Sequence, residues 1–232
     1  MSNYHRGVIL AIDSSAGASV AVLDEGEIRA QWRTSETTTH AEVLASAVAE
    51  TMREAGADGS TLSGVVVGVG PGPFTGLRVG LVLAHSLAEV WDVPLHGVCS
   101  LDSLAYRAAM DPDPALAAGE EFLVATDARR REIYWAQYRF LGEGMLELIE
   151  GPHVSAASEA PRCPAVGIGA SLYPELLSAR SAQSSSWLPD AAELGQFAVT
   201  AGDAVFRDPL PLYLRESDAK VPAQMRKHQA PA

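Results

Sequence analysis

The sequence predicts an α/β protein in which one structural unit occurs twice. Both halves open with an apolar run that ends in an aspartate, Asp13 in AIDSS and Asp127 in VATDARR. In both, two strand-like segments joined by a glycine-containing turn follow the run. A continuous apolar run of this length is typical of a fully buried strand. Because strand, aspartate, hairpin and turn recur in the same order, we expect a duplicated βββαβα core.

The first half, residues 1–109, is expected to form one lobe. After the opening strand, two strands meet at a turn in which Gly26 supplies the positive φ of a hairpin. Thr39 is placed to cap the helix that follows. The elements predicted for this half are strands at 6–15, 19–24, 27–33, 63–70 and 95–100, and helices at 39–56, 75–91 and 101–109.

The second half, residues 120–217, is expected to form a smaller lobe. Turn residues and acids without hydrophobic periodicity at 110–121 indicate the link between the halves. The Pro- and Ala-containing tail at 218–232 is expected to be disordered. The elements predicted here are strands at 121–127, 132–140 and 145–150, one strand within 160–170, a short helix at 170–177 and a longer helix within 190–206.

Composition excludes several classes of protein. Hydrophobic residues make up 47% of the 232 residues and charged residues 20%, as in ordinary globular proteins. The 29 acids and 17 bases give a net charge of -12, which argues against a broad nucleic-acid-binding face. The two cysteines form no CxxC pair, which indicates free thiols in a reducing compartment. The first apolar run is too short for a signal peptide or a spanning helix, so we expect a cytoplasmic protein without membrane contact.

The stretch GVGPGPFTG, residues 68–76, resembles a phosphate-binding loop, because a glycine-rich turn opens a helix there. A Walker A motif would need a lysine after its last glycine, and none is near. The dinucleotide motif would need Gly or Ala where Pro73 stands, and Pro71 and Pro73 also remove two N–H donors. These residues disfavour phosphate binding.

The helix after this turn carries small residues at Gly76, Gly80, Ala84 and Ala88. A spacing of four places them along one face of the helix. Such a strip permits close packing on the protein's own sheet or contact with another protein. The residues alone leave both interpretations open.

Few residues suggest catalysis. The histidines form no HxxxH or HxH pair, and no GxSxG motif occurs. Asp13 and Asp127 could hold Mg²⁺ through water, or each could cap the turn that follows it. Arg129, Arg130 and Arg131 form a basic run, which either lies on a solvated strand edge or contacts RNA.

Five segments together resemble the TsaB (YeaZ) family of bacterial partner proteins in tRNA threonylcarbamoyladenosine synthesis. In order they are AIDSS, GVGPGPFTGLRVGL, GVCSLDSLA, TDARRREIYWAQY and PLYLR. The resemblance runs from about residue 7 to residue 215. It implies a two-lobed actin/hexokinase-like (ribonuclease-H-like) fold, in agreement with the repeat.

The resemblance also implies a pseudoenzyme. The sister enzyme TsaD transfers the threonylcarbamoyl group to the adenosine next to the anticodon in tRNAs that read codons beginning with A. It carries two metal-binding histidines four residues apart, where this chain has Ser100 and Leu104. Leucine cannot ligate a metal. We therefore expect an accessory subunit that supports TsaD, with no catalytic residue, metal or cofactor of its own.

The resemblance implies that helices 39–56 and 75–91 pack against the equivalent helices of TsaD. A TsaE-type ATPase is expected to join the pair, so ATP, Mg²⁺ and a TsaD-bound metal belong to the complex. The protein is expected to meet tRNA through this complex and to form a homodimer when alone. The expected interface residues are His40, Leu44, Val48, Gly76, Arg78, Gly80 and Ala84.

Two other functions compete at this level. A stand-alone ATPase or kinase of the actin/hexokinase class would use Asp13, Asp127 and the first hairpin around ATP and Mg²⁺. A peptidase would need a metal or nucleophile constellation, which the sequence does not show.

Overall fold

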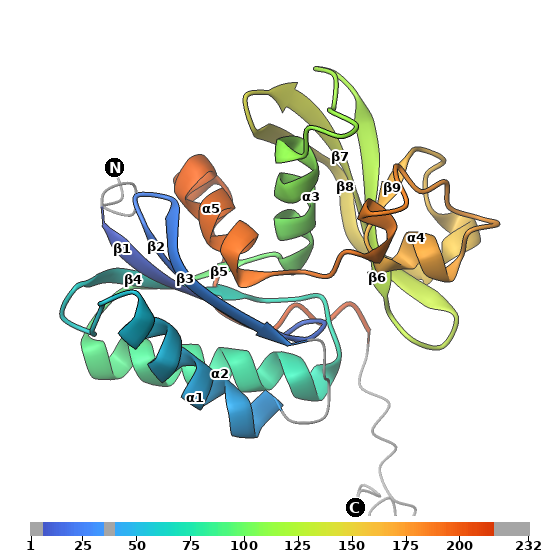
Figure 1. Ribbon diagram of the computed structural model, residues 1–232. Coiled ribbons are helices and arrows are strands. Elements are labelled where there is room, and N and C mark those ends of the chain that lie inside the picture. Colours follow the sequence, from blue (N-terminus) through green and yellow to red (C-terminus); the bar gives the residue numbers. More distant parts are fainter. Residues whose placement is uncertain (1–6, 35–39, 216–232) are drawn as a thin grey trace, which may run out of the picture.

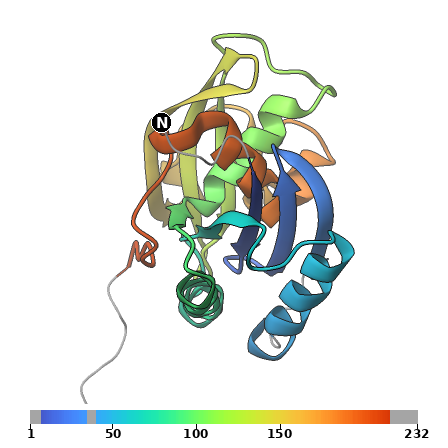
Figure 2. The same ribbon diagram turned by 90° about the vertical axis from the view of Figure 1, so that its left-hand side faces the viewer.

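The computed structural model describes residues 7–34 and 40–215, folded around two β-sheets (Figure 1). Each sheet forms the centre of one lobe, and helices lie outside and between the lobes (Figures 1 and 2). The predicted cap Thr39 and the tail at 218–232 lie outside the described residues.

The first sheet has the strand order β3-β2-β1-β4-β5. Strands β1, β2 and β3 pair antiparallel, whereas β4 and β5 continue the sheet in parallel from the other side of β1. Glu25 and Gly26, with φ of 51° and 86°, form the hairpin turn that the sequence predicts. The strands are β1 (Val8–Asp13), β2 (Ala18–Asp24), β3 (Glu27–Thr34), β4 (Leu62–Gly68) and β5 (Leu95–Val98).

The second sheet repeats this plan in the order β8-β7-β6-β9. Three antiparallel strands are again followed by a parallel neighbour of the first of them. The predicted two-lobed, actin/hexokinase-like fold with a duplicated core is confirmed. The strands are β6 (Glu121–Asp127), β7 (Glu132–Gly142), β8 (Met145–Ala156) and β9 (Ala165–Val166).

Helices cover both faces of the first sheet. α1 (His40–Glu54) and α2 (Phe74–Trp91) lie side by side under one face, and α5 (Ala191–Ala201) lies on the other (Figures 1 and 2). The alternation of side chains along β1 explains this arrangement, because Leu10 packs towards α1 and α2 whereas Ile9 packs towards α5. In the described part of the chain, every helix is too short or too polar to cross a membrane.

The two lobes exchange a helix. α3 (Ser100–Met110) precedes the second sheet in the sequence, yet its Leu104 packs with Phe122 of β6. α5 follows the second sheet, yet its Leu194 packs with Ile9 of β1. The domain boundary expected at residues 110–120 stays a prediction, since packing crosses it in both directions.

The second lobe differs from the sequence prediction in its shorter elements. α4 (Ile168–Leu172) ends earlier than the predicted helix at 170–177, because Tyr173 precedes Pro174 and a residue before proline disfavours helical geometry. β9 has only two residues, and β8 runs six residues beyond the predicted end at 150. Single turns of 3₁₀ helix complete the fold: η2 (Ala157–Glu159), η3 (Ser184–Ser186) and η4 (Gly202–Ala204).

Candidate functional site

The glycine-rich turn before α2 packs tightly on the protein's own backbone. Gly70, with φ of 93°, donates its N–H to the Ser100 hydroxyl at 3.1 Å and accepts a hydrogen bond from the Ser100 N–H at 2.8 Å. A Cβ at Gly68 would lie 1.8 Å from the Asp13 carboxylate, and a Cβ at Gly72 would lie 2.5 Å from the Ser15 carbonyl oxygen. The glycines therefore allow a close approach between this turn and residues 13–15. This packing role accounts for them without a bound phosphate.

Asp13 is committed to this same network. Its Oδ1 accepts hydrogen bonds from the Ser15 N–H at 2.8 Å and the Ser15 hydroxyl at 2.7 Å, and Oδ2 accepts one from the Ser100 hydroxyl at 2.5 Å. The carboxyl is 1% exposed, and burial raises its pKa against the opposing effect of these hydrogen bonds. The prediction that Asp13 could hold Mg²⁺ is therefore wrong, because hydrogen bonds from Ser15 and Ser100 occupy its oxygens and the carboxyl is buried.

Ser100 and Leu104, which the resemblance places where the sister enzyme has its metal ligands, are also buried. Ser100 ties Asp13 to the turn, and Leu104 is part of the core of the second lobe. Among residues 7–34 and 40–215, no group of three or more His, Cys, Asp or Glu side chains is arranged to hold a metal ion. Leu104 supplies no donor atom there.

A cavity of about 390 Å³ lies between the β1–β2 turn of the first lobe and the β6–β7 turn of the second. Ser15 and Thr75 line it from the first lobe, and Asp127, Arg129 and Tyr134 line it from the second. Asp127 accepts a hydrogen bond from the Arg129 N–H at 2.7 Å and lies 3.2 Å from the Arg129 guanidinium. Of the two candidate carboxylates, Asp127 alone lines this cavity, and an arginine already neutralises it.

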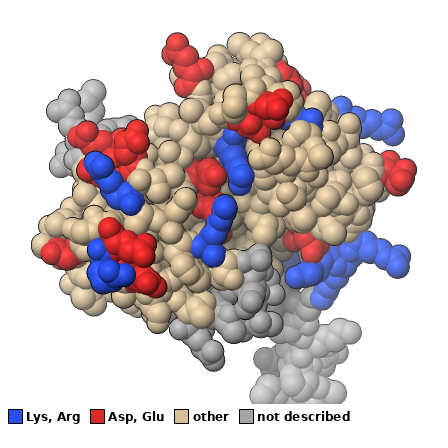
Figure 3. All heavy atoms as spheres, in the orientation of Figure 1, with Lys and Arg blue, Asp and Glu red and all other residues tan. Residues whose placement is uncertain are grey.

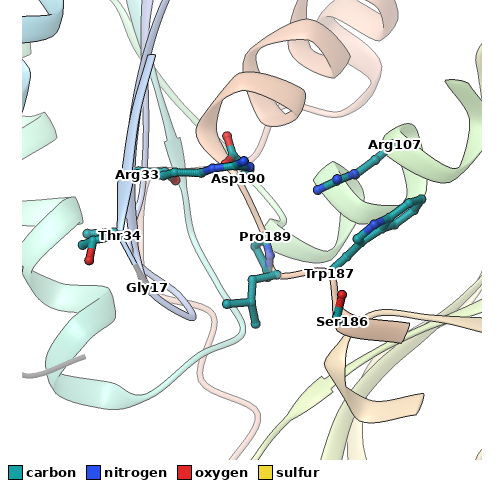
Figure 4. Close-up of a pocket in the computed structure, with 11 residues that line it drawn as sticks. Gly17, Arg33, Thr34, Arg107, Ser186, Trp187, Pro189 and Asp190 are labelled. Carbon is teal, nitrogen blue, oxygen red and sulfur yellow. The ribbon is translucent and has the colours of Figure 1, made fainter. Parts of the chain in front are cut away.

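A second cavity, of about 560 Å³, opens between β3 and α3 (Figure 4). Arg33 reaches in from one wall and Arg107 from the other, with Asp190 between them (Figure 4). Arg33 lies 3.6 Å from the Asp190 carboxylate, which also caps α5 through the Ala192 N–H. Arg107 stacks on the Trp187 ring at 4.3 Å. These contacts join elements of both lobes at this second cavity.

A buried carboxyl lies between α3 and β7. Asp102 of α3 accepts a hydrogen bond from the Tyr138 hydroxyl of β7 at 2.6 Å. Burial raises the pKa of Asp102 to about 6, although the bond from Tyr138 opposes the shift. Asp102 therefore holds a proton at mildly acidic pH.

The strip of small residues on α2 faces the protein's own sheet. Gly80 donates its N–H to the Ser14 hydroxyl at 3.1 Å, and the same hydroxyl donates to the Gly76 carbonyl at 2.9 Å. A Cβ at Gly80 would lie 2.4 Å from the Ser14 Oγ, and Ala84 is fully buried. The prediction that Gly80 and Ala84 contact a partner is therefore wrong, because this face of the helix packs inside the protein.

The other expected interface residues divide in the same way. Leu44 and Val48 of α1 are buried in the core and are also wrong as direct contacts. Gly76 is partly buried and lines the inter-lobe cavity, and Arg78 is exposed. The side chain of His40 lies outside the described part of the chain.

The surface that α1 and α2 leave to solvent combines exposed apolar side chains with polar ones. We call it the outer α1–α2 face. Val82 and Val90 are 66% and 77% exposed. The sequence holds a signal for this face that the predicted interface residues do not use: α2 has apolar residues on all sides, which is unusual for a helix with a solvated face. The residues of the face are Ala45, Ser46, Ala49, Glu50, Val82, His85, Ser86, Glu89 and Val90.

An aromatic and cationic cluster lies at the N-terminal end of α2. The rings of Phe74 and Tyr213 stack at 4.7 Å, with the Arg78 guanidinium 3.5 Å from the centre of the Phe74 ring. Arg78 also donates a hydrogen bond to the Tyr213 hydroxyl at 2.8 Å. The late PLYLR segment is thereby fixed to α2 at the start of the outer face.

Comparison with known proteins points in one direction. Residues 33–166 match the family model described as TsaD: tRNA N6-adenosine threonylcarbamoyltransferase. An uncharacterised protein of Mycobacterium tuberculosis (strain ATCC 25618 / H37Rv) is 36% identical over 95% of this chain and 97% of its own length. The tRNA threonylcarbamoyladenosine biosynthesis protein TsaB of Escherichia coli (strain K12) is 32% identical over 56% of this chain and 54% of its own length. The structure of YeaZ from Pseudomonas aeruginosa superposes with a TM-score of 0.74 at 29% identity, covering 90% of this chain and 100% of that one.

Proposed function

Because the chain belongs to the TsaB (YeaZ) family, we propose that it is a non-catalytic subunit that binds a TsaD-type transferase in tRNA threonylcarbamoyladenosine biosynthesis. In this role it supports transfer of the threonylcarbamoyl group to the adenosine next to the anticodon of tRNAs that read codons beginning with A. The match of residues 33–166 to the TsaD model supports such a pairing, since related chains can associate through equivalent surfaces.

The polar groups of the cleft support a role without chemistry. The Asp13 carboxylate is covered and fully hydrogen-bonded, and Leu104 offers no ligand atom. A stand-alone ATPase or kinase would need a carboxylate open to the cleft for Mg²⁺. Asp127 lines the cleft cavity but is paired with Arg129, so the geometry favours the subunit over the ATPase.

The outer α1–α2 face carries the proposal. Val82 and Val90 lie eight residues apart, which places them about 80° apart around α2, so both exposed side chains fall on the solvent-facing side of the helix. On the neighbouring surface of α1, Ala45 and Ala49 have short side chains, which allow the backbone of another helix to approach closely. Exposed charges such as Glu50 border these apolar groups, as in protein interfaces with an apolar centre and a polar rim.

We assign the helices of the TsaD-type subunit to this face, and a second copy of this chain to it when that subunit is absent. A TsaE-type ATPase joins the pair. ATP, Mg²⁺ and a transferase-bound metal then belong to the partner subunits, and tRNA is bound by the assembled complex.

Reconstituted threonylcarbamoyl transfer to tRNA tests the proposal. The TsaD-type and TsaE-type proteins of the same organism should transfer the group efficiently only when this chain is added. Val82→Glu should abolish the stimulation without lowering the melting temperature, because the valine is 66% exposed and a charge in the centre of an interface is costly. Leu176→Glu is the matched control, since Leu176 is 52% exposed on the second lobe. Full transfer in the absence of the chain, or full stimulation by Val82→Glu, would refute this account.

A further inference from the structure

The turn between β6 and β7 combines backbone strain with a run of arginines. Arg129, Arg130 and Arg131 have φ of 61°, 56° and 65°. In this left-handed region the Cβ of an ordinary residue crowds the following carbonyl oxygen, which glycine avoids. In the described part of the chain, the other non-glycine residues with positive φ occur singly: Glu25, Asp92 and Glu143.

The backbone of this turn is fixed by its own contacts. The Ala128 N–H donates to the Glu132 carbonyl at 3.1 Å, and the Glu132 N–H donates to the Arg129 carbonyl at 3.0 Å. The Arg215 guanidinium donates to the Ala128 carbonyl at 3.0 Å. Glycine would adopt the same turn with less strain. Three strained arginines in a turn whose backbone is held by hydrogen bonds indicate that their side chains have a role there.

The arginine turn, residues 128–131, forms a positive patch on an acidic protein. Arg129, Arg130 and Arg131 are all exposed, while the chain carries a net charge of -12. Figure 3 shows Lys and Arg atoms gathered at the lower right, where the β6–β7 turn projects in Figure 1. Asp127 pairs with Arg129, and Glu132 pairs with Arg215.

We propose that the arginine turn binds the phosphate backbone of the RNA that the complex modifies. This inference rests on the proposed function, which brings RNA to the partner subunit. Guanidinium groups bind phosphate oxygens through paired N–H donors, and they remain charged at any physiological pH. A cluster of this kind supplies affinity without reading sequence.

The position of the turn suits this role. Arg129 and Thr75, at the start of α2, line the same cavity. A partner docked along the outer α1–α2 face therefore ends beside the arginine turn, and RNA held by that partner passes within reach of the guanidiniums. Tyr134 lines the same cavity and adds an aromatic ring next to the patch.

The test uses the assembled complex of this chain with its TsaD-type partner and a fluorescently labelled tRNA. Fluorescence anisotropy gives the Kd at several salt concentrations, and the slope of log K against log salt reports the number of phosphate contacts. The double variant Arg130→Gln/Arg131→Gln should weaken binding about tenfold and reduce the magnitude of the slope by about 1 to 2, equally for tRNAs of different sequence. The variant Arg29→Gln, at an exposed site on β3 of the other sheet, should leave both values unchanged.

A glycine variant separates strain from charge. Arg131→Gly should raise the melting temperature, because glycine relieves the positive φ of 65°, while it weakens tRNA binding. Complex formation is measured separately by light scattering. Unchanged affinity and slope in a complex of normal mass would overturn the RNA contact and leave the proposed function intact. Loss of the complex in the double variant would identify the turn as a protein contact and also overturn it. Failure of the unaltered chain to form the complex would contradict the proposed function itself.

Discussion

Replacing Gly80 with alanine should destabilise the protein, although alanine is the better helix former. Gly80 lies inside α2, where exchange of glycine for alanine alone would gain about 1 kcal/mol. The added Cβ would lie 2.4 Å from the Ser14 Oγ and 3.1 Å from the Ser14 Cβ. Ser14 must therefore move away from α2.

The cost follows from what Ser14 does. Its hydroxyl accepts a hydrogen bond from Gly80 and donates one to the Gly76 carbonyl, and each is worth about 1 kcal/mol. Crowding a well-packed site adds about 1 kcal/mol or more. Set against the helix gain, the net loss is about 2 kcal/mol. For a chain of this size that lowers the melting temperature by about 4–8 °C.

Differential scanning calorimetry and urea unfolding measure this loss. Ser86→Ala, at an exposed position of the same helix, should change stability by less than about 0.5 kcal/mol. Combining Ser14→Ala with Gly80→Ala should cost less than the sum of the single changes, because both remove the same hydrogen bonds. A higher melting temperature for Gly80→Ala would show that the small residues of α2 do not face the sheet.

Other changes probe the lobe junction and the thiols. Burial raises the pKa of Asp102 to about 6 in the folded chain, above the usual 3.8, so its contribution to stability is complete below about pH 4 and is lost as the pH rises through 6. Asp102→Asn still accepts the Tyr138 hydrogen bond and should flatten this decline in urea unfolding by on the order of 3 kcal/mol. A pH profile that the variant does not change would contradict the buried, protonated carboxyl. Burial raises the pKa of Cys163 to about 11 and that of Cys99 still further. Both thiols should therefore react with a disulfide reagent at pH 8 more slowly than free glutathione does. A rapid reaction phase with the amplitude of one thiol per chain would refute this. Asp190→Ala removes the side-chain cap of α5 and should cost about 1 kcal/mol in urea unfolding, whereas an unchanged midpoint would mean that the cap contributes nothing.

The repeat in the sequence was enough to predict the two sheets. Asp13 and Asp127 end strands that occupy the same place in each sheet, and the hairpin at Gly26 forms as expected. The exchange of α3 and α5 between lobes could not be predicted, because a helix with a buried stripe packs equally well on either sheet until the chain path is known. Pro174 predicts that α4 ends before it, but the apolar residues on both sides of Pro174 favoured a longer helix.

The candidate site was harder to predict, because burial depends on tertiary structure. Gly80 and Ala84 have the spacing of a contact strip, but Ser14 fills the space above Gly80. Asp13 has the place of a metal-binding carboxylate, but Ser100 lies 87 residues away in sequence and closes it off. Val82 and Val90 stand out only once the core-facing side of α2 is known.

We propose above that the outer α1–α2 face docks a TsaD-type subunit. Size-exclusion chromatography with light scattering, on this chain mixed with that protein from the same organism, tests it most directly. We expect a single species with the mass of the mixed complex, and separate components when Val82→Glu is used instead. Separate components with the unaltered chain, or a mixed complex that Val82→Glu leaves intact, would contradict the claim.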